Sequence, residues 1–144
     1  MHRTIFFITV VSLTFYSTLS MAQHEEEAEQ AQQVAKEWLP LVDKEQYSES
    51  WDVASPLFQQ SVTQDQWAQA AKQVRDPLGA LQSRDVKKAE YTTSLPKAPE
   101  GEYVVVEYAS AFSNLEDAVE TVVMTKTEED DWATVGYFIR PAAQ

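Results

Sequence analysis

The stretch EYVVVEYASAF, Glu102–Phe112, carries the strongest strand signal in the chain. It is rich in β-branched and aromatic residues, which favour extended structure. Its alternate residues define two faces, and both faces are largely apolar. A strand of this kind is typical of the middle of a sheet, where both sides are covered. The sequence therefore predicts a central, doubly covered strand here.

Three further strands are predicted around this one. Alternating hydrophobicity indicates a strand before it at 84–93 and two after it at 118–127 and 132–139. The intervening loops are short and contain proline, glycine or acidic residues, which are typical of turns. Short connections of this kind favour antiparallel pairing between consecutive strands, so we expect a four-stranded meander.

The segment upstream of the strands has helical spacing instead. Apolar residues recur at helical intervals over 28–42, and the polar stretch 23–30 is expected to be the frayed start of this first helix. Pro40 predicts either a kink at 36–40 or a helix that ends close to Asp43, because proline cannot donate a helical hydrogen bond.

Two more helices are predicted after the first. One is expected at 46–53, with a possible extension to Phe58. The other begins at the capping box of Thr63 and Gln66 and ends at Arg75, since Pro77 follows closely. Its predicted apolar stripe contains Trp67, Ala70, Ala71 and Val74.

Helices followed by strands predict the α+β class. We expect three N-terminal helices packed on a curved four-stranded antiparallel sheet. Trp38, Tyr47 and Trp51 lie on the apolar stripes of the first two helices. Large aromatic side chains fill the gap between helices and a sheet well, so these three are predicted to belong to the core rather than to a ligand site.

The N-terminus has the pattern of a secretory signal peptide. A positive charge at Arg3 precedes the mostly apolar stretch 5–16, and small residues follow it. We predict a signal peptide at 1–22, cleavage between Ala22 and Gln23, and a single domain at 23–144. The protein is then expected to be periplasmic or secreted, with no membrane association after cleavage.

Charge and composition narrow the function classes. The formal net charge of −12 disfavours nucleic acid as a partner. The absence of cysteine excludes disulfides, thiol catalysis and thiolate metal ligands. His24 is the only histidine in 23–144, so neither a histidine metal site nor a Ser-His-Asp triad is expected. We predict no catalytic residue, no metal site and no cofactor.

A set of spaced motifs runs along the chain: Trp38-Leu39, Asp43, Tyr47, Ser50-Trp51, Trp67, Arg75, Pro77-Leu78-Gly79, Arg84, Pro96, Pro99, Gly101, Tyr103, Phe112, Glu120-Thr121, Trp132 and Gly136-Tyr137. Together these motifs resemble those of the DUF4019 family. The resemblance implies a small secreted bacterial domain of unknown function, with a cone-like α+β fold related to the NTF2-like and cystatin-like folds. The chain departs from the family pattern at Pro40 and at Asp130-Asp131, where a helix-compatible residue and a glycine are expected.

Polar residues within the apolar strands are the remaining candidates for a site. A buried carboxylate needs a cation or a hydrogen-bond donor beside it. One interpretation, which we favour, is that Arg75 or Arg84 neutralises a buried glutamate for structural reasons. The other is a pocket at the mouth of the cone with a glutamate as polar anchor or general base. The candidate ligand-binding residues are Arg84, Tyr103, Glu107 and Glu120.

Three functional hypotheses follow. The leading one is a non-catalytic periplasmic or secreted domain that binds an unknown protein or small molecule, so the chain is more naturally a binding module than an enzyme. The first alternative is an isomerase or dehydratase of the NTF2-like type that uses a buried glutamate and tyrosine. The second is an assembly subunit that forms a homodimer through its sheet, which an exposed apolar sheet face would favour.

Overall fold

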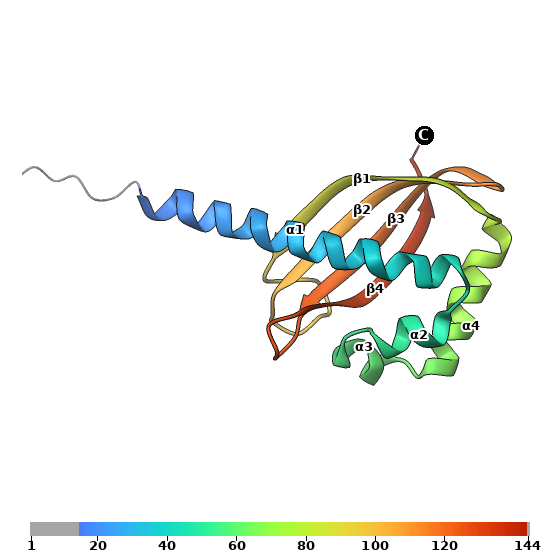
Figure 1. Ribbon diagram of the computed structural model, residues 1–144, viewed down its shortest axis with the longest axis horizontal. Coiled ribbons are helices and arrows are strands. Elements are labelled where there is room, and N and C mark those ends of the chain that lie inside the picture. Colours follow the sequence, from blue (N-terminus) through green and yellow to red (C-terminus); the bar gives the residue numbers. More distant parts are fainter. Residues whose placement is uncertain (1–14, 144) are drawn as a thin grey trace, which may run out of the picture.

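The computed structural model describes residues 15–143, with side chains from residue 19 onward, and it is an α+β fold (Figure 1). Helices occupy the first half of the described chain and strands the second half, as predicted. The elements are α1 Phe15–Asp43, α2 Tyr47–Asp52, α3 Pro56–Ser61, α4 Gln64–Arg75, the 3-10 turn η1 Asp76–Leu78, β1 Leu81–Thr92, β2 Tyr103–Phe112, β3 Leu115–Lys126 and β4 Trp132–Pro141.

The sheet is an antiparallel meander in the order β1-β2-β3-β4. The prediction of four consecutive antiparallel strands is confirmed, and β2 does lie in the interior of the sheet. The first strand begins at Leu81 rather than at Arg84. The turn between β3 and β4 places Asp130 at a φ of 66°, a conformation in which a glycine would be less strained.

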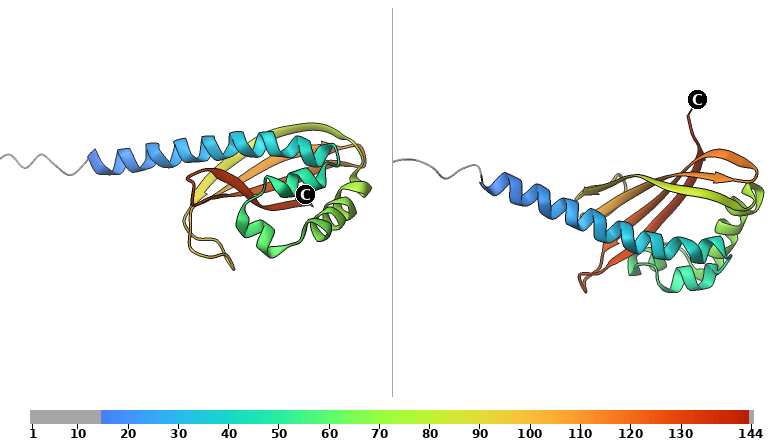
Figure 2. Two further views of the ribbon diagram at one scale, coloured as in Figure 1. Left: turned by 60° about the horizontal axis from the view of Figure 1, so that its bottom comes forward. Right: turned by 45° about the horizontal axis from the view of Figure 1, so that its top comes forward.

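The helices cover only one face of this sheet. Figures 1 and 2 show α1 lying along the sheet, with α2, α3 and α4 on the same side. Along β2, Val104, Val106 and Tyr108 face the helices and are buried, whereas Val105 and Ala109 on the other face are half-exposed. The prediction that β2 is covered on both sides is therefore wrong, because the helices form a single layer.

The number of helices also differs from the prediction. The described residues contain four α-helices instead of three, because the chain breaks at Val53–Ser55. Ser55 caps α3 by accepting a hydrogen bond from the Phe58 N–H, and Pro56 occupies the first turn. A serine followed by proline is a helix-start signal, so this break was readable in the sequence.

The first helix is longer and better anchored than predicted. It continues through Pro40 and ends at Asp43, as expected. The prediction that 23–30 is frayed is wrong: these residues are helical, and Glu27 accepts hydrogen bonds from Lys126 Nζ at 2.7 Å and Trp132 Nε1 at 3.0 Å. Lys126 and Trp132 extend from the sheet to Glu27, and these contacts hold a part of the helix that local propensity alone would leave frayed.

Much of the predicted signal peptide lies outside the described residues. Residues 1–14 are not described, and the proposed cleavage point at Ala22 and Gln23 falls within α1, so cleavage stays a prediction. Over residues 15–143, no helix combines the length and the apolar character needed to cross a membrane.

Ser50 on α2 ties the helical layer together. Its hydroxyl accepts a hydrogen bond from Trp67 Nε1 at 2.9 Å and donates one to the Tyr47 carbonyl oxygen. Its own carbonyl oxygen accepts from Trp38 Nε1 at 2.9 Å. Trp38, Tyr47 and Trp67 are buried, and Trp51 is half-buried with its indole donating to a backbone carbonyl. The aromatic residues of the first helices are thus core residues, as predicted.

Replacing Ser50 by alanine is expected to destabilise the protein by about 1–3 kcal/mol, because it leaves the buried Trp67 N–H without an acceptor. The exposed Ser48, in the same helix, is the matched control, and Ser48→Ala is expected to change stability by less than about 0.5 kcal/mol. Urea unfolding monitored by tryptophan fluorescence measures both values. Equal stabilities for the two variants would contradict the role assigned to Ser50.

Candidate functional site

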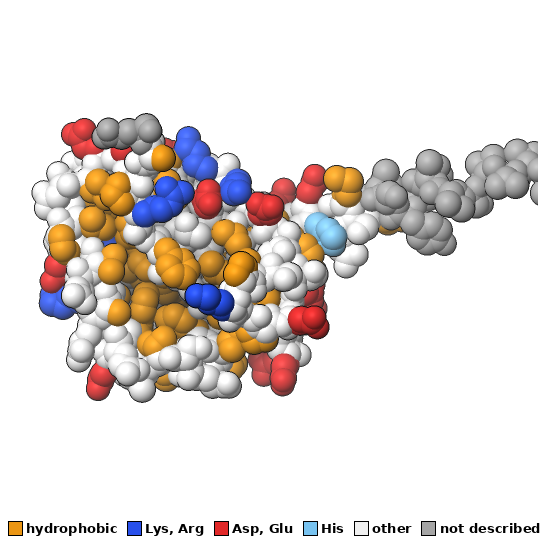
Figure 3. All heavy atoms as spheres, turned by 180° about the vertical axis from the view of Figure 1, so that it is seen from behind, with side chains coloured by type: hydrophobic (Ala, Val, Ile, Leu, Met, Phe, Trp, Pro, Cys, Tyr) orange, Lys and Arg blue, Asp and Glu red, His pale blue; other side chains and the backbone are white. Residues whose placement is uncertain are grey.

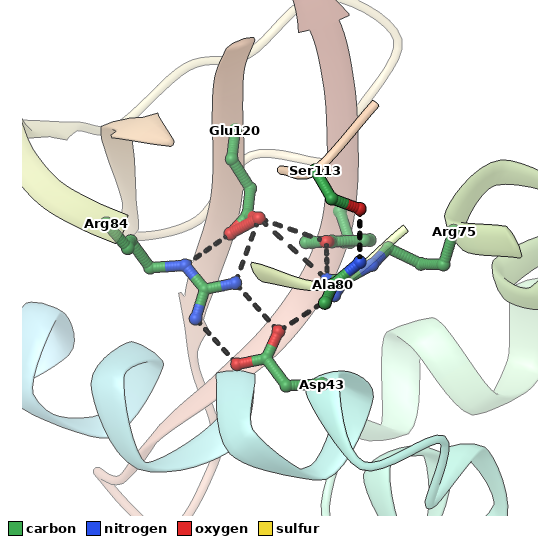
Figure 4. Close-up of polar contacts among 7 residues, drawn as sticks. Asp43, Arg75, Ala80, Arg84, Ser113 and Glu120 are labelled. Atoms are coloured by element: carbon green, nitrogen blue, oxygen red, sulfur yellow. Dashed lines mark hydrogen bonds and ion pairs between the residues drawn. The ribbon is translucent and has the colours of Figure 1, made fainter. Parts of the chain in front are cut away.

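A tight reversal between α4 and β1 brings two arginines together. Arg75 ends α4, η1 follows, and Gly79 adopts a φ of 75° before β1 begins. A side chain at Gly79 would be strained by this φ and would collide with the Ser113 hydroxyl, which accepts the Ala80 N–H at 3.0 Å (Figure 4). The reversal turns the chain back on itself, so that Arg75 and Arg84 approach the same carboxylates.

Arg84 is bound by two carboxylates at once. Its Nη1 and Nη2 donate to the two Asp43 oxygens at 2.7 and 2.9 Å. Its Nε and Nη2 donate to the two Glu120 oxygens at 2.7 and 3.0 Å (Figure 4). Each carboxylate accepts from two neighbouring nitrogens of the planar guanidinium, which is the bidentate geometry typical of strong arginine–carboxylate pairs. Arg84 therefore joins the end of α1 to β3 through its own strand, β1.

Arg75 closes the network from the other side. Its Nη2 lies 3.0 Å from Asp43 Oδ1, and its Nη1 donates to the Tyr137 hydroxyl at 3.0 Å. Tyr137 in turn donates to Glu120 Oε2 at 3.3 Å. The Arg75 guanidinium carbon also lies 4.8 Å from the centre of the Phe112 ring. We call Asp43, Arg75, Arg84, Glu120 and Tyr137 the charge network.

The charge network is mostly buried and is formally neutral. The Glu120 side chain is 0% exposed and that of Arg75 is 7% exposed. Burial on its own raises the pKa of Asp43, but hydrogen bonds and charge from Arg84 and Arg75 outweigh this effect and hold the pKa below its ordinary value. Burial, followed by the nearby Glu120 carboxylate, raises the pKa of Tyr137. At neutral pH the tyrosine is therefore a proton donor within the network.

The contacts of these two carboxylates suit a structural role better than a role as general base. Both Asp43 oxygens and both Glu120 oxygens are engaged by arginine donors. A general base needs a carboxylate oxygen free to take a proton from a substrate. The contact that the favoured interpretation expects is present, because Arg84 binds the buried Glu120 and Arg75 lies 4.0 Å from it; its structural role stays a prediction.

The four candidate ligand-binding residues do not form one site. Arg84 and Glu120 meet in the charge network, whereas Glu107 lies on the opposite face of the sheet. Tyr103 is the first residue of β2, and its hydroxyl donates to the Pro99 carbonyl oxygen at 2.8 Å. The prediction grouped both glutamates as candidates for one site, whereas the strand register places them on opposite faces of the sheet.

The sequence reading missed Asp43 and Tyr137 as partners in this network. It also misplaced the buried face of α4: Ala70 and Val74 are exposed, while Trp67, Ala71 and Arg75 are buried. These three recur every four residues, a spacing that is as helical as the predicted one. The signal was present, but the predicted stripe contained only apolar residues and so left Arg75 out.

A hollow of about 370 Å³ lies beside the charge network. Its lining includes Asp43, Glu45, Tyr47 and Arg75. The Tyr47 hydroxyl and Arg75 Nε are buried near it without a hydrogen-bond partner. No group of three or more histidine, aspartate or glutamate side chains within residues 19–143 is arranged to hold a metal ion.

The uncovered face of the sheet is the second notable feature, and we call it the open face. Figure 3 shows apolar side chains gathered over its middle. The strand registers place Val105 and Ala109 of β2 beside Val123 and Val119 of β3 on this face. All four are half-exposed, and Phe138 on β4 is 62% exposed. Apolar side chains gathered on one exposed face mark an interaction site in many soluble proteins.

Comparison with known proteins identifies the family. A family model, DUF4019, described as a protein of unknown function, matches residues 34–137. The chain belongs to the DUF4019 family. The matched segment runs from α1 to Tyr137 and so includes every member of the charge network. No curated protein and no solved structure gives a match.

The two glutamates provide a matched test of this geometry. Glu120→Gln is expected to destabilise this DUF4019 domain by about 3 kcal/mol or more, because it leaves buried arginine charge uncompensated. Glu107→Gln, the same change on the neighbouring strand and the opposite face, is expected to cost less than about 0.5 kcal/mol. Denaturant unfolding measures both, and similar losses would contradict the assignment of the two faces.

The lowered pKa of Asp43 makes its contribution dependent on pH. The unfolded chain binds a proton at Asp43 near pH 4, and the folded chain binds it at a lower pH. The stabilisation is therefore present above about pH 4 and is lost as the pH falls through the folded pKa. The stability difference between the wild type and Asp43→Asn should shrink from about pH 5 to pH 2 in denaturant unfolding. The exposed control, Asp117→Asn, should differ little from the wild type throughout.

Proposed function

We propose that this protein is a non-catalytic interaction domain that works through the open face of its sheet. The observation that carries the proposal is the unpaired apolar surface formed by Val105, Ala109, Val119 and Val123. Burying such a surface stabilises a complex by roughly 25 cal/mol for each Å² removed from water.

The charge network supports binding over the enzymatic alternative. A buried glutamate and tyrosine are present in Glu120 and Tyr137, as an NTF2-like isomerase or dehydratase would require. However, Arg84 engages both Glu120 oxygens, and the tyrosine donates to the same carboxylate. These groups satisfy one another, so the geometry favours their role in holding the helices on the sheet.

The same proposal includes a location and a finer description of the fold. The signal-peptide pattern at 1–22 supports export, so we place the domain in the periplasm or outside the cell. The single helical layer on one face of the sheet supports a cone of the NTF2-like or cystatin-like type. We expect no nucleic acid or membrane partner, because the net charge of −12 repels both phosphate backbones and anionic lipid.

Site-specific photo-crosslinking in living cells of the natural host tests this function. A diazirine amino acid replaces Val119, which is half-exposed on the open face. The matched control replaces Val74, which is 45% exposed on the helical side. We expect one discrete covalent adduct at position 119 and none at 74. If neither position gives an adduct, or both give the same adduct, the open face is not a specific binding surface.

A further inference from the structure

We propose that the partner bound by the open face is a second copy of this chain, packed with β1 of one copy over β4 of the other. This inference rests on the proposed function and names the partner for the same surface. It follows from the order of charged and apolar residues across the strands.

The strand registers define three rows of residues across the open face, running from β1 to β4. Each row has a polar or aromatic residue at one or both edges. In the first and third rows the two central residues are apolar. The rows are Asp85–Ala109–Val119–Arg140, Lys88–Glu107–Thr121–Phe138 and Glu90–Val105–Val123–Gly136.

A two-fold axis parallel to the strands reverses each row onto itself. Such an axis is one of two ways to pack identical sheets face to face with aligned strands. In the first row, Asp85 then lies over Arg140 of the other copy, and Ala109 over Val119. In the third row, Val105 lies over Val123. In the first row opposite charges therefore meet at the edges, and in the first and third rows apolar residues meet in the centre.

The second row also pairs without conflict in this arrangement. Lys88 lies over the exposed Phe138 ring of the other copy, where a cation and an aromatic face attract. Glu107 lies over Thr121, whose hydroxyl can donate to a carboxylate. No pair of like charges is brought together in any of the three rows.

The other possible two-fold axis, perpendicular to the strands, is electrostatically unfavourable. It would place Lys88 over Lys88 and Glu107 over Glu107 of the other copy. It would also place Asp85 over Glu90. Like charges facing each other across an interface oppose association. The charge pattern therefore selects the axis parallel to the strands.

A hollow on the open face provides a place for Arg140 of the other copy. It has a volume of about 390 Å³ and lies in the first row, beside Ala109 and Val119. Its acidic lining residues are Asp85, Glu107, Glu116 and Asp117. Within residues 19–143 neither Asp85 nor Arg140 takes part in an ion pair, so both charges are available to a second chain.

The size of the face is sufficient for a dimer of modest affinity. Four strands about 4.8 Å apart and about ten residues long cover at most roughly 650 Å² per copy, because Tyr103 and Thr125 at one end of this face are already buried. The two copies together would bury at most about 1,300 Å², which lies at the lower end of the range for specific interfaces.

Charge reversal tests both the partner and its orientation. The full chain, purified as the cell delivers it, is compared with Asp85→Arg and Arg140→Asp by sedimentation velocity at micromolar concentrations. Each variant alone places two pairs of like charges in the dimer, so we expect its dissociation constant to rise at least about tenfold. An equimolar mixture should dimerise again within about threefold of the wild type, because both edge pairs then carry opposite charges.

Two exposed charges on the helical side provide controls. Glu49→Arg and Lys36→Asp make the same changes in charge away from the open face and should leave the dimer unchanged. A monomeric wild type at about 100 μM, unaffected single variants, or a mixture that stays monomeric would each overturn the inference. A position-119 adduct of a mass other than twice the chain would also overturn it while leaving the proposed function intact. The absence of any adduct would remove both.

Discussion

The arrangement of the molecule depends on one interaction, the binding of the Arg84 guanidinium by the carboxylates of Asp43 and Glu120. Asp43 is the last residue of α1, and Glu120 lies in the middle of β3. A buried charge of this kind is tolerated only when its partners are in place, so the network allows one position of α1 over the sheet. Arg75 adds the end of α4 to the same point.

This arrangement separates the two faces of the sheet into different roles. On the covered face, the carboxylates of the charge network accept hydrogen bonds from its arginines and from Tyr137, and these contacts hold the helices. On the open face, apolar residues lack a partner within the described chain, and Asp85 and Arg140 at its edges take part in no ion pair within residues 19–143. We therefore propose binding rather than catalysis, through the surface that the helices leave uncovered.

Much of the fold could be predicted from local signals in the chain. Three such signals are confirmed: the capping box at Thr63 and Gln66, the end of α4 before Pro77, and the alternation along Tyr103–Phe112. Each of them depends only on residues that are neighbours in the sequence. The helix break at Ser55 was available from the same kind of signal and was overlooked. The family resemblance was also readable, because its tryptophan, arginine and glycine motifs are spread over the matched segment 34–137.

The sequence by itself determined the α+β class, the meander of four strands, the family and the need for an arginine beside a buried glutamate. Only the tertiary structure decided that Glu120 faces the helices and Glu107 faces away, although both interrupt equally apolar strands. Alternation shows which residues share a face but does not show which face a distant helix covers. That choice depends on contacts between residues far apart in the chain, such as Asp43 with Arg84, which no local pattern encodes.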